Sequence, residues 1–144
     1  MKKVRAAVVV ERGAPIRVEE VDLEDPREGE VRVKLVASGV CHSCLHAAAG
    51  SWTHMPGPIA LGDEGAGIVE AAGPGVRGVH EGDHVVLSWS PTCGLCHYCT
   101  NGRPVLCERR APRPGTLPDG TTRLWTWGKP LYHVWHRGQP RART

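Results

Sequence analysis

Phenylalanine is absent from this 144-residue sequence, and aromatic residues of all kinds make up only 5% of it. A core must therefore be built from Val, Leu, Ile and Ala, with some of the five tryptophans. No apolar run approaches the roughly 18 residues of a membrane-spanning helix, and the run at residues 6–10 is too short for an export signal. We therefore predict a cytoplasmic protein with no membrane partner, in which cysteines serve as metal ligands or free thiols.

Glycine and proline are abundant, with 18 and 12 copies. This composition favours strands joined by turns, so we predict a single, mainly β domain with short helices. One short helix is predicted at residues 42–49, an alanine-rich segment that ends at Gly50. Strands are predicted at residues 4–10, 16–23, 30–40, 67–72 and 84–89.

Two of the predicted strands show an alternation of apolar and polar residues. Ile16 and Val18 share one face of the second strand, and Val31, Val33 and Leu35 share one face of the third, with Arg32 and Lys34 on the other. We expect both apolar faces to be buried.

The net charge of +3 hides an asymmetry along the chain. Residues 1–108 carry 10 basic and 14 acidic residues, whereas residues 109–144 carry eight basic residues and Asp119 as their only acid. We predict one domain at residues 1–133 and an unstructured basic tail at residues 134–144, which shows no periodicity. We interpret this tail as a truncated or frame-shifted end, or as a disordered linker.

Cysteine spacing gives the most specific signal in the sequence. Four cysteines follow the pattern C-x2-C-x2-C-x7-C within fifteen residues. Four thiolates on one loop can surround a single ion at Zn–S distances of about 2.3 Å, and with no open position they form a structural site. We predict structural zinc in a lobe at about residues 91–110, with Cys93, Cys96, Cys99 and Cys107 as its ligands.

Two other interpretations of the four cysteines are weaker. An iron–sulfur cluster of the ferredoxin type uses C-x2-C-x2-C-x3-C followed by proline, but here the last gap is seven residues and Glu108 follows. Disulfides suit small exported proteins, and cysteines separated by two residues on one loop pair poorly.

Two further segments contain side chains that can carry chemistry. Residues 38–46 hold two cysteines, two histidines and two serines on one turn or short helix, and residues 61–67 hold two carboxylates in a glycine frame. Each segment alone has an ordinary explanation, such as a buried cysteine or an acidic turn. The side chains concerned are Cys41, His42, Ser43, Cys44, His46, Asp63 and Glu64.

Together with the lobe, these segments resemble the zinc-dependent alcohol dehydrogenases of the medium-chain dehydrogenase/reductase family. The resemblance rests on residues 39–43, 61–67 and 81–86 and on the four-cysteine lobe. It implies a partly open β-barrel of the GroES-like kind with a projecting structural-zinc lobe. In that family this catalytic domain precedes a Rossmann NAD(P) domain, which is absent from this sequence.

The resemblance also implies roles for particular residues. In the family a catalytic zinc acidifies the alcohol so that hydride can pass to the nicotinamide. Cys41 matches the first ligand of that zinc, and Asp63 stands where the family has a histidine ligand. Ser43 and His46 match the hydroxyl and imidazole that pass the alcohol's proton outward, and Glu64 matches the acidic residue close to the metal.

Three departures from the family pattern affect this site. Asp63 is shorter than histidine and adds negative charge, so we expect weaker acidification of a bound alcohol or weaker retention of the metal. Cys44 replaces a common aspartate, and its thiol can compete as a ligand. The remaining cysteine ligand and the cofactor domain lie, in the family, beyond the point where this chain stops.

Residues 73–78 match the dinucleotide-binding pattern G-x-G-x-x-G letter for letter. The pattern requires a helix that begins at the third glycine, and here the glycine is followed by another turn around Gly82. We therefore expect NAD or NADP to act only through a missing domain.

The sequence thus predicts the catalytic-domain portion of an alcohol dehydrogenase, incomplete and inactive as this chain alone, with a small alcohol or aldehyde as substrate and a possible homo-oligomeric state. The alternative is a non-catalytic, zinc-stabilised GroES-like binding module. A nucleic-acid partner is not predicted, because the loop from Cys93 to Cys107 has no basic face, with Arg103 as its only arginine or lysine.

Overall fold

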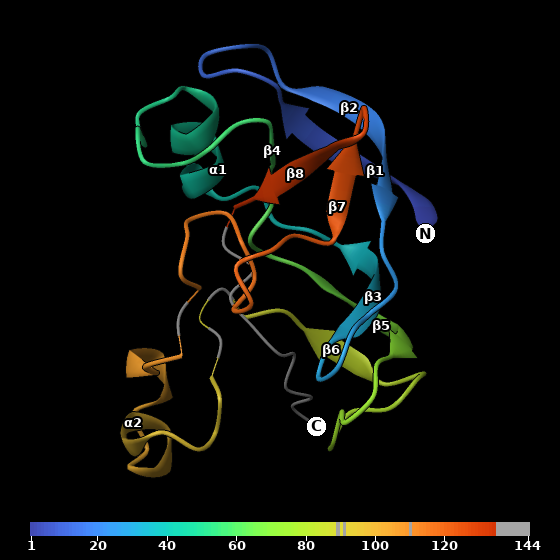
Figure 1. Cartoon of the computed structure of the whole chain (residues 1–144), viewed down its shortest axis with the longest axis vertical. Coiled ribbons are helices and arrows are strands. Elements are labelled where there is room, and N and C mark those ends of the chain that lie inside the picture. The colour runs from blue at the N-terminus through green and yellow to red at the C-terminus, as the bar shows by residue number, and fades with distance from the viewer. Residues whose placement is uncertain (89, 91, 110, 135–144) are drawn as a thin grey trace.

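Five strands form a closed ring of hydrogen-bonded neighbours, and three others form a separate sheet (Figure 1). This computed structural model describes residues 1–88, 90, 92–109 and 111–134. The ring strands, in spatial order, are β1 (Lys2–Val9), β2 (Arg17–Leu23), β7 (Leu124–Thr126), β8 (Lys129–His133) and β4 (Ile59–Ala60). The sheet strands are β3 (Val31–Ala37), β5 (Ala66–Ala72) and β6 (His84–Val86). The predicted mainly β barrel is confirmed, and its ring is closed rather than partly open.

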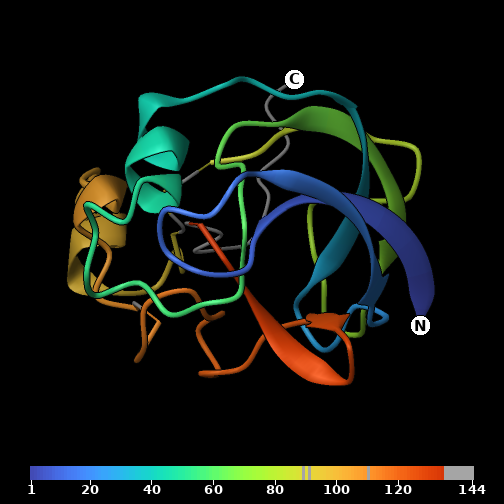
Figure 2. The ribbon, with the colours of Figure 1, turned by 90° about the horizontal axis from the view of Figure 1, so that it is seen from above.

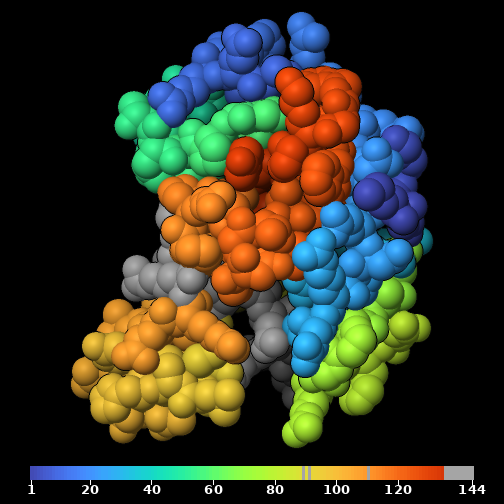
Figure 3. Space-filling model, viewed as in Figure 1, coloured from blue at the N-terminus to red at the C-terminus, as the bar shows by residue number. Residues whose placement is uncertain are grey.

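Short helices lie outside the ring. The predicted helix is present as α1 (His42–Ala48), and it is followed by Gly50 with φ 77°, a left-handed conformation that suits glycine. Helix α2 (His97–Thr100) and the 3-10 helix η1 (Pro104–Leu106) lie in a lobe that stands out from the body of the molecule (Figure 3). Seen from above, α1 lies outside the ring on the same side as this lobe (Figure 2). None of the described helices has the length and apolar character needed to cross a membrane.

The five strands predicted from periodicity are present as β1, β2, β3, β5 and β6. β6 ends at Val86, before the predicted end, and Trp89 lies outside the described residues. The sequence analysis missed β4, β7 and β8. β4 and β7 have two and three residues and are too short to show a period of two, and β8 contains Pro130, which argues against a strand in a sequence pattern. Long-range pairing defines them instead: β4 pairs with β1 and β8, and β7 pairs with β2 and β8.

The alternation of apolar residues predicted the buried face of one strand and not of the other. Val31 and Val33 pack against the buried core of the three-stranded sheet, as expected, but Leu35 on the same predicted face is 52% exposed. For the second strand, however, Val18 in β2 and Ile16 just before it are 71% and 47% exposed, whereas Val21 is 1% exposed. The apolar face of this strand was therefore assigned wrongly, because one strongly packed residue on the opposite face outweighs a weak alternation.

A second core joins α1 to the barrel and extends to the end of the described chain. Val134 is fully buried, and its N–H donates to the carbonyl of Ala60 at 3.0 Å. Val134 therefore belongs to the folded core, whereas the sequence analysis placed it in the tail; residues 135–144 lie outside the described residues. Six buried residues form this core: Val9, Ala47, Ala48, Met55, Ile59 and Val134.

Residues 73–83 form turns between β5 and β6 and contain no helix. The G-x-G-x-x-G match therefore lacks the helix N-terminus that binds a pyrophosphate.

A buried guanidinium connects the start of β3 to the loop before β7. The Arg123 side chain is 8% exposed and pairs with Glu30 at 2.6 Å and with Asp119 at 2.5 Å. Burial acts to raise the pKa of Asp119, but hydrogen bonds from Arg123 and Thr121 outweigh it and lower this pKa to about 2. The ionised form of Asp119 therefore stabilises the folded state.

This network predicts a loss of stability in acid. The folded pKa of Asp119 lies below its ordinary value of 3.8, so its contribution is complete above about pH 4 and is lost as the pH falls through about 2. Since its side chain is 42% exposed, we expect this contribution to be about 1 kcal/mol, less than the full pKa shift would give. Asp119→Asn should lower stability at pH 7 and flatten its decline between about pH 4 and 2. Urea unfolding at several pH values measures the free energy of unfolding of Asp119→Asn and of a control, Glu81→Gln, which changes an exposed carboxylate. If this free energy fell equally steeply between about pH 4 and 2 in both variants, the prediction would be contradicted.

Candidate metal centres

The four predicted lobe cysteines converge on one point. Their Sγ atoms all lie within 4.8 Å of one another. Cys93 Sγ lies 4.0 Å from Cys99 Sγ, and Cys96 Sγ lies 3.9 Å from Cys107 Sγ. Four sulfurs placed tetrahedrally about 2.3 Å from one ion would be separated by about 3.8 Å. The donor set therefore fits a single tetrahedral ion such as zinc, with no open position.

Backbone amides of the same loop point at these sulfurs. The N–H groups of Leu95 and Cys96 donate to Cys93 Sγ at 3.4 and 3.3 Å, and that of Cys93 donates to Cys107 Sγ at 3.3 Å. The amides of Leu95 and Cys96 lower the pKa of Cys93. Amides of Glu108 and Cys99 lower the pKa of Cys96 to about 6. The loop thus favours thiolates, the form that binds metal.

The opposite shift at Cys99 shows why a cation is needed. Removal from water raises the pKa of this thiol to about 11, and its hydrogen bonding with Cys96, Cys107 and Cys93 adds to the rise by favouring the protonated form. Four negative sulfurs so close together repel one another, and a divalent ion compensates this charge.

Disulfides and a polynuclear cluster fit the lobe less well than one ion. All six cysteines of the chain are unbridged, and the Cys93–Cys99 and Cys96–Cys107 sulfurs are 4.0 and 3.9 Å apart, about twice an S–S bond length. In an iron–sulfur cluster the four thiolates are divided between two irons or bind four different ones, which would hold some of the sulfurs farther apart than one ion does.

A second donor group forms where α1 meets the loop between β4 and β5. Cys41 is the N-cap of α1, and ligand atoms of Cys41, Asp63 and Glu64 lie within 4.8 Å of one another. Asp63 is 8% exposed and Glu64 is exposed. A thiolate and two carboxylates form an anionic set that suits a divalent cation, and three donors leave one tetrahedral position open.

Gly39 makes room for this group. A Cβ added to Gly39 would lie 1.9 Å from Glu64 Oε2 and 3.0 Å from Glu64 Cδ. The hydroxyl of Ser38 also donates to the backbone carbonyl of Glu64 at 2.9 Å. The side chain of Glu64 therefore occupies space that only a glycine at position 39 leaves free. The sequence analysis quoted Gly39 in the motif but did not identify this reason.

The other predicted site residues lie on α1. The Ser43 Oγ atom lies 3.2 Å from Cys41 Sγ, and the Ser43 N–H donates to the same sulfur at 3.4 Å. Cys44 is buried and its Sγ lies 3.8 Å from Asp63 Oδ1. Burial raises the pKa of Cys44, and the charge of Asp63 raises it further. This keeps Cys44 as a thiol donating to Asp63 in the metal-free protein.

His46 is not among the three clustered donors. It is exposed on α1, where its ring stacks between His42, at a centroid distance of 4.7 Å, and Trp52, at 6.1 Å. The sequence analysis gave no role to His42 or Trp52. The spacing of four residues between His42 and His46 was the available signal for their contact.

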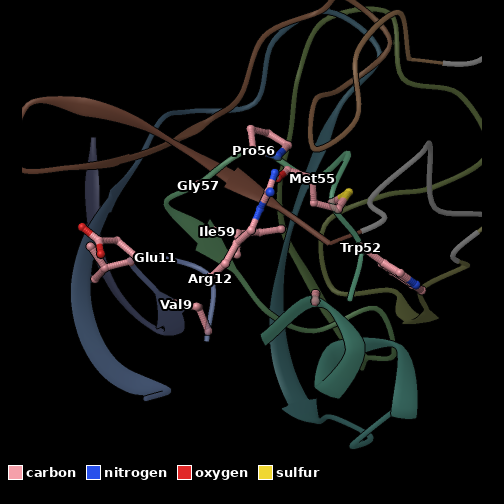
Figure 4. A pocket seen from close by; sticks show the side chains of 10 residues that line it. Val9, Glu11, Arg12, Trp52, Met55, Pro56, Gly57 and Ile59 are labelled. Carbon is pink, nitrogen blue, oxygen red and sulfur yellow. The ribbon is translucent and has the colours of Figure 1, made fainter. Parts of the chain in front are cut away.

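A pocket between β1 and the segment after α1 contains no residue of either donor group. Arg12 extends across it (Figure 4), donates to the carbonyl of Thr53, and reaches that of Met55 at 3.4 Å. Its apolar lining includes Val9 and Trp52. We assign this pocket a structural role, because Arg12 fixes the segment that carries Trp52.

A small β-barrel with a projecting four-cysteine lobe and a second donor group at a helix N-cap is the arrangement expected of a GroES-like metal-binding domain. Residues 27–129 match the family described as the alcohol dehydrogenase GroES-like domain. The chain therefore belongs to this family, and the predicted GroES-like fold is confirmed.

Similar proteins include an NDMA-dependent alcohol dehydrogenase from Amycolatopsis methanolica, 46% identical over 88% of this chain and 34% of the relative. The S-(hydroxymethyl)glutathione dehydrogenase from Photobacterium damsela subsp. piscicida is 41% identical over 91% of this chain and 36% of that protein. An alcohol dehydrogenase zinc-binding domain protein from Burkholderia ambifaria superposes with a TM-score of 0.82 at 39% identity, covering 92% of this chain and 36% of the other. The chain thus spans about a third of the length of these relatives.

Proposed function

We propose that this chain forms the zinc- and substrate-binding part of an NAD(P)-linked alcohol dehydrogenase that interconverts a small alcohol and its aldehyde. The observation that carries the proposal is the convergence of Cys41, Asp63 and Glu64 within 4.8 Å beside the hydroxyl of Ser43. The family membership and the names of the relatives support the same function.

In this proposal Cys41 and Asp63 hold the catalytic zinc, and Cys93, Cys96, Cys99 and Cys107 hold the structural zinc. Zinc, when bound, supplies Lewis acidity that lowers the pKa of an alcohol oxygen. Glu64 places a second carboxylate beside the donors, where it adds charge and can act as a further ligand. Cys44, next to Asp63, is a further thiol donor in reach of the same carboxylate.

Ser43 and His46 are proposed to handle the alcohol's proton. The Ser43 hydroxyl lies beside Cys41 Sγ, at the inner end of α1. The imidazole of His46 lies at the solvent-exposed surface of the same helix. A hydroxyl near the donors and an imidazole in water are suited to accept a proton at the site and to release it outside, since histidine titrates near neutral pH.

The nicotinamide cofactor is proposed to bind outside the residues described here. Those residues contain no βαβ unit, and their G-x-G-x-x-G sequence forms turns. We therefore expect no NAD-linked oxidation from these residues alone, and oxidation only when a nucleotide-binding domain is joined or added.

Metal counting tests the proposal. We expect about two zinc ions per folded chain, and about one in Asp63→Asn, because the amide is a much weaker ligand than the carboxylate. Asp63→His should keep the second ion and hold it against a chelator for longer. Native mass spectrometry and plasma emission spectroscopy both measure the number of zinc ions per chain in the unmodified protein and in the variants.

The alternative function, a non-catalytic binding module with structural zinc only, makes a different prediction. It expects about one zinc ion in the unmodified chain and no effect of Asp63→Asn on that number. Glu81→Gln, at an exposed turn, is a matched control that should leave both counts unchanged.

A further inference from the structure

Two exposed histidines lie one helical turn apart on α1 and are already stacked. The ring centroids of His42 and His46 are 4.7 Å apart with an interplanar angle of 21°. Neither imidazole makes a hydrogen bond or ion pair with the described residues, and both rings are reachable from solvent. Imidazoles at positions i and i+4 of a helix lie on one face and can bind one metal ion together.

We propose that the His42–His46 pair is a further metal site, which chelates a divalent transition-metal ion through one nitrogen of each ring. Imidazole nitrogen suits borderline ions such as Ni²⁺, Cu²⁺ and Zn²⁺. The two side chains already lie together on one face of α1, and turning the rings out of their stacked arrangement brings one nitrogen of each to the same ion. Water completes the coordination, so this site differs from both sulfur-containing donor groups.

Trp52 limits the position of the His46 ring. Its indole stacks on His46 at a centroid distance of 6.1 Å and an interplanar angle of 23°, and it packs against the core that joins α1 to the barrel. Arg12 fixes the following segment by donating to the carbonyl of Thr53. One side of the His46 ring is therefore covered, and His42 lies within chelating reach of its ring.

His54 lies beyond the tryptophan and is not a member of the pair. Its ring stacks on Trp52 at 6.1 Å. It is exposed like the other two histidines and belongs to the same row of rings, yet the indole stands between it and His46. His54 therefore provides a matched control within the same structural feature.

The proposed site has a consequence that rests on the proposed function. A metal ion on His46 would occupy the imidazole that we propose to release the substrate's proton. Ions of this class should then slow alcohol oxidation in an assembled dehydrogenase without removing either zinc ion.

The test is a titration of the zinc-loaded chain with Ni²⁺. Binding is measured by calorimetry and by the quenching of tryptophan fluorescence, and released zinc is measured in parallel. We compare the unmodified chain with His42→Gln, His46→Gln and His54→Gln. Losing one member of a chelating pair should weaken Ni²⁺ binding by about tenfold or more. His54→Gln should bind Ni²⁺ as the unmodified chain does, and no zinc should be released.

Unchanged Ni²⁺ affinity in His42→Gln or in His46→Gln would overturn the proposed pair. So would a loss of Ni²⁺ affinity in His54→Gln as large as in these two variants, or a release of zinc that parallels the uptake of Ni²⁺. Thermal unfolding shows that each variant is folded; His42 is exposed and stacks only on His46 among the described rings, so His42→Gln remains informative even if His46→Gln disturbs Trp52. A failed proposed function would change the zinc count and leave Ni²⁺ affinity unaltered, so the two failures can be distinguished.

Discussion

Cys96→Ser is expected to remove one zinc ion per chain and to unfold the lobe at residues 93–107. The hydroxyl is a poor zinc ligand, and the three remaining thiolates cannot complete a tetrahedral site. Structural zinc contributes about 10–16 kcal/mol of apparent binding free energy in small zinc-finger peptides. Helix α2 has four residues and η1 has three, too few to persist without the ion.

Metal analysis and hydrogen exchange of the lobe amides measure this effect. Leu95→Ser is the matched control, because Leu95 is 83% exposed on the same loop and contributes no sulfur. We expect the control to keep its metal and its exchange protection. If Cys96→Ser retains its zinc content and melting temperature, the lobe does not depend on a bound ion and the four-thiolate assignment is wrong.

Gly67→Ala is expected to destabilise the three-stranded sheet severely. A Cβ at this position would lie 2.2 Å from the carbonyl oxygen of Lys34 and 2.9 Å from Cγ1 of Val33. Gly67 pairs with Leu35 and with Val85, so β5 cannot move without breaking its contacts to β3 and β6. We expect a loss of roughly 3 kcal/mol or more, because backbone atoms cannot rotate away from the added methyl group.

Gly65→Ala is the matched control for this substitution. Its Cβ would meet Leu35 Cδ2 at 2.9 Å and Leu87 Cδ1 at 3.0 Å, and these side-chain ends can move. A change of 3 kcal/mol in a chain of this size lowers the melting temperature by roughly 10 °C. Equal melting temperatures for the two variants would show that the close approach of β3 and β5 at Gly67 is not rigid.

The sequence alone determined the local features of this protein, whose residues lie close together along the chain. Cys93, Cys96, Cys99 and Cys107 span fifteen residues, so their spacing already restricts them to one small loop, within reach of a single ion. Helix α1 was predicted almost to the residue, because the alanine-rich segment favours a helix and the glycine that follows it ends the helix.

Only the tertiary structure decided which distant residues meet. Cys41 and Asp63 are separated by 21 intervening residues, and their convergence with Glu64 depends on how α1 and the loop after β4 pack. The short strands β4 and β7 and the burial of Val21 likewise depend on long-range partners. Local patterns report the preferences of single segments, whereas the pairing of segments is set by the free energy of the whole core, which no short stretch of sequence contains.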